Sequence, residues 1–527
     1  MPMVMHRRGP LRVVFTLLLL VGSTRGAERA APQSYSHDLL PFDGITTHVL
    51  PGVDVDALRA EDEARIGERI PLRVAARVNL TIDLLDDATT EFLPEGGVVR
   101  RWRFDSPEAL FLSFKFSAFE LPPGAQLHFV SVERDYFQGP YTDAYHRSTG
   151  RFGSPPVPGS SAVIELYLPD ASAEPRLVVE SVSHGYREAM GMGSARNRTD
   201  DGEPAGDEGP AETRGGGPFG CKVDIVCPEG EPWFDDGRAS AEGYDGIFIC
   251  SGQLINNVLE DNRYLYLTAE HCQWWQDPST MAYYWNYQNQ TCDGNDFPPF
   301  TFSVGSTDLF HSSSPQTDLD LLELDGPDLE RLYNIYFQGW DRGADPAEMG
   351  AMIGYPNDFP KQITIGNDPV VDCDIGPCPG GFGPEYWRVN EWHVGISLVG
   401  SSGSCLLNED HRLVGVLSGG VGTSCDNFAW DEFSKISSEW DNLQPFLDPN
   451  DSGAVSIPGK DGFDVTCEGD ANGDGTVDPL DSGYVLARFG CPVGTGDPDC
   501  DAADQNRDGE VNPLDVGFVL ARFGECP

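Results

Sequence analysis

The chain has 527 residues, which is long enough for several domains with separate hydrophobic cores, and it carries 84 acidic against 35 basic residues. The net charge of −49 argues against a nucleic-acid partner, because the phosphates would be repelled. The charge predicts an acidic, soluble surface, and steering of basic substrates is its functional alternative.

A secretory signal peptide is predicted over residues 1–26. Basic residues at 7, 8 and 12 precede a largely apolar run over 13–21, and small residues follow by 26–27. The run is too short to span a bilayer, and the sequence predicts no other transmembrane segment. Export permits disulfides, which suits 13 cysteines that all lie from Cys221 onward; the odd count leaves at least one thiol unpaired or bonded to another chain. We therefore expect a secreted, extracellular protein.

Residues 27–188 are predicted to form a β-rich domain. Apolar and polar residues alternate between Val98 and Val182, and Pro-Gly turns separate the alternating runs. Residues 189–219 are rich in Gly, Asp and Glu with almost no apolar content, which predicts a disordered, protease-accessible linker. The first domain contains no constellation of catalytic residues.

Residues 220–447 are predicted to form an all-β double barrel, because short apolar strands alternate with Gly, Pro and Asp turns. An apolar strand that starts at Tyr264 runs into a turn carrying His271. Further on, acids and leucines alternate over 317–324, and the first acid, Asp318, enters a half-buried strand. Asp320 is the rival acid, since residues two apart in a strand share a face.

The sequence Gly400-Ser401-Ser402-Gly403 predicts a sharp turn from which the Ser402 hydroxyl projects. A serine hydroxyl is a poor nucleophile until a base takes its proton. The order His271, Asp318, Ser402 is one of the known orders of a catalytic triad. We predict these three residues as base, orienting acid and nucleophile, and the amides of Gly400 and Ser402 as the oxyanion hole. An ordinary Gly/Ser loop is the alternative for this stretch taken alone.

Residues 220–450 resemble the trypsin-like serine proteases, and specifically the bacterial lysyl endopeptidases. The similarity lies in Leu267-Thr-Ala-Glu-His-Cys272 and in the segments 284–292 and 339–342. It implies a chymotrypsin-like double β-barrel, a serine endopeptidase without a catalytic cofactor, and a pro-region before it, with an independent binding domain as the alternative for that region. It also implies three disulfides: Cys221 with Cys425, Cys227 with Cys292, and Cys250 with Cys272.

Ser401 departs from the trypsin pattern. Trypsin has an aspartate before its nucleophile, which pairs with a newly freed N-terminus, and Ser401 cannot make that ion pair. Control of the precursor must work otherwise, and masking by the pro-region is the expected route. Because the serine motif departs from the usual one, a catalytically inactive binding protein on a protease fold is the alternative function.

Specificity is predicted from the segment 430–440, which resembles the family segment carrying the acid of the primary pocket. The resemblance implies that Asp431 lies at the pocket base. A buried carboxylate needs a cationic partner, so cleavage after Lys or Arg is expected; a surface acid is the alternative. Ser418, Gly419 and Gly420 end a predicted strand, and we expect this edge to pair with the substrate backbone.

After a polar Ser/Gly/Pro linker over 448–465, residues 466–527 contain a duplication. Residues 470–481 recur as 504–515, and a predicted helix follows each copy. Oxygen ligands with a Gly at position 6 suit Ca²⁺. The predicted ligands are Asp470, Asn472, Asp474, Thr476, Asp481, Asp504, Asn506, Asp508, Glu510 and Asp515.

These paired loops, each with one following helix and an Asp at position 12, resemble dockerin type I repeats. The resemblance implies that Ca²⁺ folds this α-helical module and that a cohesin-type protein is its partner. A Ca²⁺-stabilised C-terminal tail without a partner is the alternative.

Overall fold

A computed structural model describes residues 30–65, 68–133, 136–191, 221–294, 301–314, 316–326, 329, 333–422, 428–462, 469, 471–472, 476–491, 500, 503–506 and 511–525. Residues 31–466 form one compact unit, and residues 467–527 lie in a second. The predicted signal peptide and nearly all of the predicted linker 189–219 lie outside the described residues. Within the described part, no helix has both the length and the apolar character needed to cross a bilayer.

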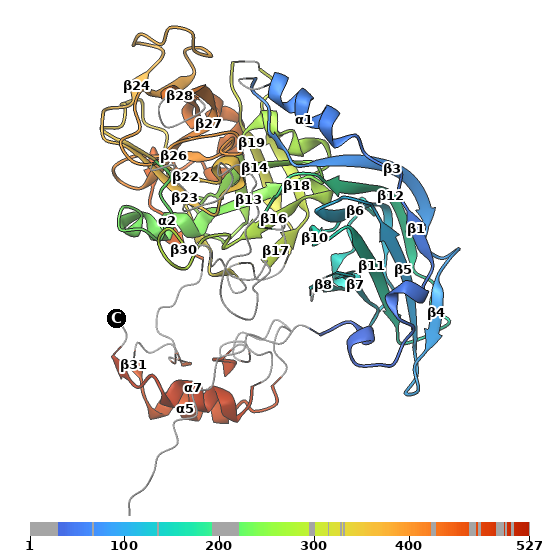
Figure 1. Ribbon diagram of the computed structural model, residues 1–527. Helices are drawn as coiled ribbons and strands as arrows, with labels where there is room; N and C mark the ends of the chain where they lie inside the picture. The colour runs from blue at the N-terminus through green and yellow to red at the C-terminus, as the bar shows by residue number, and fades with distance from the viewer. Residues whose placement is uncertain are drawn as a thin grey trace, which may run out of the picture. The chain divides into compact units, whose positions relative to one another are not determined.

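The first part of the larger unit consists of two sheets that enclose an aromatic-rich core (Figure 1). One sheet has the order β1-β5-β11-β7-β8 with β4 on β5, and the other has the order β10-β6-β12-β3 with β9 on β6. Apolar side chains of both sheets, such as Trp102 and Phe116, meet in this core. The elements are β1 (Thr47–Val49), α1 (Val55–Ala64), β3 (Ala75–Asp83), β4 (Thr89–Phe92), β5 (Val98–Asp105), β6 (Phe111–Glu120), β7 (Gln126–Ser131), β8 (Phe137–Tyr141), β9 (Phe152–Gly153), β10 (Val157–Pro158), β11 (Ser161–Leu168) and β12 (Arg176–Gly185).

Two further sheets follow, which makes the chain mainly β, as predicted. The first has the order β17-β16-β13-β14-β15-β19-β18, and β2 of the N-terminal part pairs with β14. Buried side chains of both sheets, among them Leu267 and Val416, form one core. The strands of the first sheet are β2 (Leu72–Arg73), β13 (Ser240–Tyr244), β14 (Phe248–Leu254), β15 (Leu265–Thr268), β16 (Ala282–Trp285), β17 (Thr301–Val304), β18 (Ser306–His311) and β19 (Asp320–Leu324).

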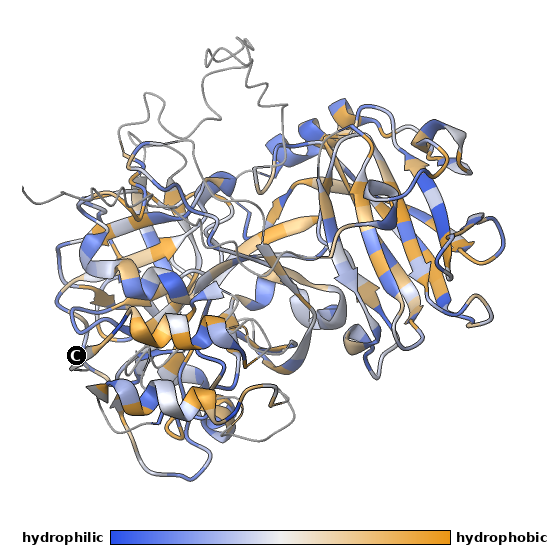
Figure 2. Ribbon diagram, turned by 90° about the horizontal axis from the view of Figure 1, so that it is seen from below, coloured by the Kyte–Doolittle hydropathy of each residue, from blue (hydrophilic) through white to orange (hydrophobic). Residues whose placement is uncertain are grey.

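The second of these sheets has the order β23-β22-β26-β27-β28-β25-β24, with β21 between β27 and β29. By contrast, apolar and polar residues alternate along strands of the N-terminal part, at the right of Figure 2. The elements are α2 (Phe234–Ala239), β20 (Tyr336–Phe337), β21 (Gly339–Asp341), β22 (Gly350–Gly354), β23 (Gln362–Gly366), β24 (Val371–Asp372), β25 (Tyr386–Val389), β26 (Cys405–Leu407), β27 (Arg412–Gly422), β28 (Phe428–Lys435) and α4 (Trp440–Leu447).

The segment 448–465, predicted as a linker, contributes two short strands to this unit. β29 (Ser456–Ile457) pairs with β21, and β30 (Lys460–Asp461) pairs with β20. Ile457 packs against the core, so even a polar segment gains backbone hydrogen bonds and a hydrophobic contact here. The chain therefore remains attached to the sheet beyond α4.

In the second unit, the duplicated sequence gives two copies of the same local structure. Helices α5 (Pro479–Leu486) and α7 (Pro513–Leu520) each begin with a proline and a capping box. Strands β31 (Thr476–Val477) and β32 (Gly524–Glu525) pair with each other. Four of the core residues occupy equivalent positions in the two copies, Val477 with Val511 and Val485 with Val519, and Ala471 and Ala503 complete the core.

Candidate active site

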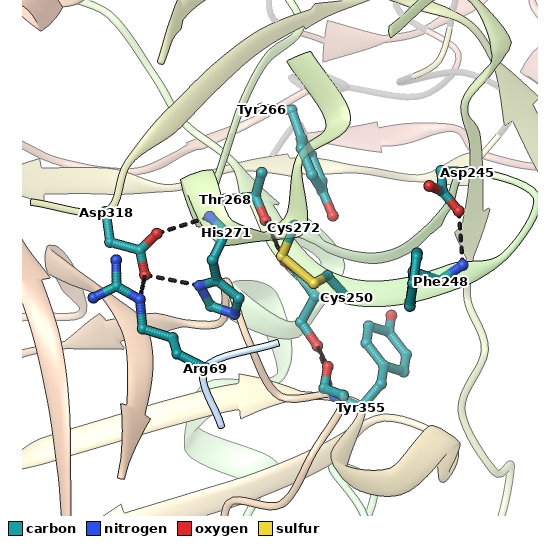
Figure 3. The surroundings of a disulfide bond; sticks show 12 residues. Arg69, Asp245, Phe248, Cys250, Tyr266, Thr268, His271, Cys272, Asp318 and Tyr355 are labelled. Carbon is teal, nitrogen blue, oxygen red and sulfur yellow. Dashed lines mark hydrogen bonds and ion pairs between the residues drawn. A yellow bond between two sulfur atoms is a disulfide. The ribbon is translucent and has the colours of Figure 1, made fainter. Parts of the chain in front are cut away.

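His271 lies in a 3₁₀ turn (η6, Glu270–Cys272) that follows β15 directly. Cys272 forms a disulfide with Cys250 of β14, so the turn is covalently attached to the sheet (Figure 3). The hydroxyl of Thr268 donates to the carbonyl of Ser251 at 2.7 Å and adds a second link between the two strands. The position of the imidazole is therefore fixed, because the residues before and after His271 are both linked to β14.

Asp318 is fully buried and receives two hydrogen bonds from His271. Its Oδ2 accepts from Nδ1 at 2.8 Å, and its Oδ1 accepts from the His271 amide at 2.9 Å. Burial acts to raise the pKa of Asp318, but the charge and hydrogen bonds of His271, with the charge of Arg69, lower this pKa to about 2. The carboxylate is therefore ionised and can only accept, which assigns the imidazole proton to Nδ1.

Asp320, the rival acid, is also buried, but both hydrogen bonds of His271 among the described residues go to Asp318. It lies at the start of β19, where it pairs with Thr268 and His311. Burial raises the pKa of Asp320 well above its ordinary range. The structure thus places the ionised carboxylate of Asp318 at the imidazole, whereas burial disfavours the charged form of Asp320 two residues away.

The loop of Ser402 packs on β14 and on the end of β15, the strand that leads to His271. The amide of Ser251 donates to the carbonyl of Ser402 at 2.8 Å, and the Ser251 hydroxyl donates to the carbonyl of Gly400 at 2.9 Å. Gly403 has a φ of +84°, and a Cβ there would lie 2.2 Å from both the Ser251 carbonyl oxygen and Thr268 Oγ1. Only glycine permits this close approach, so the nucleophile loop is held beside the histidine turn.

Two groups at this place have no hydrogen-bond partner among the described residues. The first is Nε2 of His271, which is buried. The second is the pair of amides of Gly400 and Ser402, which the described backbone leaves unpaired. A ring nitrogen that carries a lone pair and two unpaired amides are the groups that a general base and an oxyanion hole require.

Asp431 lies in β28 between Gly420 of β27 and Val389 of β25. Its Oδ2 accepts from the indole of Trp392 at 2.6 Å and from the hydroxyl of Ser397. Burial raises the pKa of Asp431 to about 6, although both hydrogen bonds lower it. Its partners in the described part of the chain are neutral, so this carboxylate has no cation beside it.

Gly419 and Gly420 lie at the end of β27 with one edge paired. They pair with Glu432 and Asp431 of β28, whereas β26 reaches only as far as Val416 on the other side. A Cβ at Gly420 would lie 2.0 Å from Oδ1 of Asp431, so a side chain there would obstruct the carboxylate. Ser418, the third residue predicted for this edge, is buried.

The two predicted Ca²⁺ loops have the same hydrogen bonds where they are described. Asp481 accepts from the amides of Asn472 and Asp478 at 3.0 and 2.8 Å, and Asp515 accepts from the amides of Asn506 and Asn512 at 2.9 and 2.8 Å. Asp481, Asp504 and Asp515 are buried, and the backbone of Thr476 lies in β31. The remaining predicted ligands, Asp470, Asp474, Asp508 and Glu510, lie outside the described residues.

Comparison with known proteins bears on both parts. Residues 217–434 match the family described as lysyl endopeptidase, C-terminal domain, and residues 468–523 match the dockerin type I domain. A Pseudomonas aeruginosa protein named lysyl endopeptidase is 26% identical over 500 residues, which cover 82% of this chain and 98% of that protein. The chain thus contains a part similar to the lysyl endopeptidases, which supports a serine endopeptidase, and a part similar to dockerin type I domains. Both predicted resemblances are confirmed.

Two solved structures are similar at low scores. The HtrA-type protease AlgW with a tripeptide is 12% identical with a TM-score of 0.28, and the match covers 41% of this chain and 62% of that chain. A Glu endopeptidase in complex with MPD is 16% identical with a TM-score of 0.28, over 42% of this chain and 95% of that chain.

The lysyl endopeptidase-like part contains the disulfides Cys227–Cys292 and Cys250–Cys272. Cys221 is disulfide-bonded, and Cys425, its predicted partner, lies outside the described residues. The sequence left Cys373, Cys378, Cys405 and the C-terminal cysteines unassigned. In the structure Cys373 pairs with Cys378, and Cys405 is a buried free thiol. In the dockerin-like part, Cys491 pairs with Cys500.

Two residues at the site were missed by sequence reasoning. Ser397 lies three residues before Gly400, but a serine there carries no motif that indicates a contact with Asp431. Arg69 of the N-terminal part lies with its Nε 3.5 Å from Asp318 Oδ2, and no local pattern could relate two residues so far apart in the sequence (Figure 3).

Proposed function

We propose that the chain is the precursor of a secreted serine endopeptidase with a chymotrypsin-like double β-barrel, which cleaves after Lys or Arg. The observation that carries the proposal is the buried pair of His271 and Asp318. The ionised carboxylate keeps the proton on Nδ1, so that Nε2 presents its lone pair to a nucleophile. The disulfide between Cys250 and Cys272, which holds the histidine turn, is consistent with an oxidising, extracellular compartment.

In the proposed reaction, Nε2 of His271 takes the proton of the Ser402 hydroxyl as the oxygen attacks a peptide carbonyl. The amides of Gly400 and Ser402 donate to the oxyanion that forms, and each such donor contributes about 10²–10³ in rate. Asp318 stabilises the imidazolium. His271 then protonates the leaving amine. In the second half of the reaction, His271 takes a proton from water as the water attacks the acyl group, and it returns the proton to Ser402 as the acyl group leaves.

The proposed preference for a basic side chain rests on Asp431. A carboxylate that is buried among neutral donors is stabilised when a substrate ammonium or guanidinium enters and pairs with it. Gly420 beside it leaves its Oδ1 unobstructed. The edge at Ser418–Gly420 is free, past Val416, to pair with an extended substrate backbone.

For residues 466–527 we propose two Ca²⁺ sites and a cohesin-type protein as partner. The donor set of carboxylate, amide and hydroxyl oxygens suits a hard cation, and Ca²⁺ would contribute folding free energy to a module with a small core. Six large apolar side chains are exposed at equivalent positions of the two repeats, which suits docking to a protein. They are Leu480, Leu486, Phe489, Leu514, Leu520 and Phe523.

Covalent labelling with a fluorophosphonate probe tests the activity. We expect the probe to attach to Ser402 in the mature protein, with Ser402→Ala unlabelled and equally folded as the control. Hydrolysis of Lys and Arg peptides should disappear in the same variant. A mature protein that neither reacts with the probe nor cleaves these peptides would be a protease-fold binding protein instead.

A further inference from the structure

Arg69, in the N-terminal part of the chain, lies directly at the proposed active site. Its Nε is 3.5 Å from Asp318 Oδ2, its Nη1 donates to the Tyr386 hydroxyl at 3.4 Å, and its guanidinium lies 5.2 Å from the centre of the Phe382 ring. Phe382 in turn lies 3.5 Å from where a Cβ of Gly419 would be. Through Phe382, Arg69 thus lies near Gly419, in the part of β27 whose edge is free to pair with a substrate.

Three residues further on, the same segment becomes a strand of the protease sheet. Leu72 and Arg73 form β2, which pairs antiparallel with Ile249 and Phe248 of β14. The amide of Val74 continues the ladder by donating to the carbonyl of Ile247 at 2.8 Å (Figure 3 shows Phe248 and Cys250 on this strand). Addition of an extended segment to an open edge is a common way for a protein to bind a peptide.

The register of this pairing leads to Ser402. Ile249 faces Leu72, so continuing the antiparallel register by two residues brings Ile70 opposite Ser251. The amide of Ser251 is already taken by the carbonyl of Ser402. Continued in this register, the segment would bring the bond between Ile70 and Pro71 to the place where the nucleophile loop meets β14.

A cavity on the same side supports this placement. It has a volume of about 530 Å³, and Ile70 and Pro71 line it together with Cys272 and Gln273, the two residues that follow His271. Arg69, Ile70, Pro71 and Leu72 thus pass in order from Asp318, past the histidine turn, to the edge of β14.

We propose that residues 69–73 occupy the substrate cleft of the precursor in the direction of a substrate, with the Ile70–Pro71 bond at Ser402, and keep the enzyme latent. The proposal rests on the proposed peptidase function. Two features protect the bond from cleavage. Ile70 offers no charge to Asp431, and the nitrogen of Pro71 has no hydrogen and lies within a rigid ring.

The register can be tested by turning the segment into a substrate. In the full chain, the double variant Ile70→Lys with Pro71→Ala should be cut between positions 70 and 71, and Edman sequencing should give Ala-Leu-Arg-Val as a new N-terminus. The same double variant with Ser402→Ala should stay intact, which excludes a host protease. As a matched control, Glu68→Lys should produce no cut after position 68.

Several outcomes overturn the proposal. If the double variant stays intact at 70–71 while its Ser402 reacts with a fluorophosphonate, the segment does not lie in the cleft in this register. If the Glu68→Lys variant is cut after position 68 while the double variant is not cut after position 70, the segment likewise does not lie in the cleft in this register. If Ser402 fails to react even in mature protein, the peptidase function itself is wrong, so the two failures are distinguishable.

Latency is measured separately, in case the double variant does not fold. The predicted protease-accessible linker 189–219 contains three arginines, Arg196, Arg198 and Arg214, after which an enzyme that prefers basic residues could cut. In a full chain with these three replaced by Gln to limit cleavage in the linker, Arg69→Gln should raise the fluorophosphonate labelling rate of Ser402 at least tenfold. Arg176→Gln, at an exposed arginine of the same region, is the control and should leave the rate unchanged. Equal rates with and without Arg69 would overturn its role in latency.

Discussion

The carboxylate of Asp318 binds His271 twice, through Oδ2 to the ring Nδ1 at 2.8 Å and through Oδ1 to the backbone amide at 2.9 Å. One residue thereby fixes both the tautomer of the imidazole and the position of the turn that carries it. Since the disulfide at Cys272 holds the same turn from its other end, the ring has little freedom to rotate. The base is therefore positioned before any substrate arrives.

Asp318→Asn should reduce kcat by roughly 10⁴, because the amide can donate to the ring nitrogen and so favours the wrong tautomer. KM should change little, since Asp318 is not in the proposed specificity pocket. The measurement is steady-state hydrolysis of a Lys peptide. Asp320→Asn is the matched control: burial disfavours the charge of this carboxyl group, so the amide should preserve most of the activity. The reverse pattern would assign the orienting role to Asp320.

Asp431→Asn should abolish the preference for Lys and Arg peptides over neutral ones, while the labelling of Ser402 by a fluorophosphonate stays near the wild-type rate. Burial raises the pKa of Asp431 to about 6, so the carboxylate loses its charge as the pH falls below that value. The inhibition constant of a small alkylammonium competitor should therefore rise about tenfold per pH unit below 6. A wild-type constant that does not change between pH 5 and 7 would contradict the pocket role.

The sequence predicted strand-rich architecture and the residues of the site where local patterns carry the information. Alternation over 98–182 indicated strands, and the turn after an apolar strand singled out His271. Contacts between residues that are far apart in the sequence have no local pattern from which they could be predicted. The hydroxyl of Ser397 meets Asp431 only because β28 lies beside its loop, and Arg69 meets Asp318 only through the pairing of β2 with β14.

The same limit applies to the predicted linker at 448–465. Its composition is that of a flexible segment, yet Ile457 pairs with Trp340 and packs on the core. Composition reports the average tendency of a segment and cannot show a single apolar side chain that finds a place on an exposed strand edge. The disulfide between Cys373 and Cys378 could not be predicted either, because neither cysteine lies in a motif that indicates its partner.

Removing the disulfide between Cys250 and Cys272 should lower the free energy of unfolding by about 3 kcal/mol, the value expected for a loop of 22 residues. A double change to Ala at both positions is the variant to use, so that no free thiol remains. Because the bridge holds the histidine turn, kcat should fall as well. Chemical denaturation and peptide hydrolysis measure the two effects. The pair Cys373–Cys378 is the control, since its removal should leave kcat unchanged; equal losses in both variants would show that the first bridge has no special relation to His271.

Chelation of Ca²⁺ by EDTA should unfold residues 467–527 while the peptidase activity of the mature enzyme persists, because the proposed catalytic groups lie in the other compact unit. Circular dichroism should lose the signal of α5 and α7, and calorimetric titration of the chelated protein should show two Ca²⁺ equivalents. Asp481→Ala and Asp515→Ala should each remove one equivalent, since each carboxylate closes the loop of its own repeat through two backbone amides. Asp441→Ala in α4 is the control for a lost carboxylate elsewhere and should retain both equivalents. A titration that shows no saturable binding, or a single variant that removes both equivalents, would contradict two independent sites.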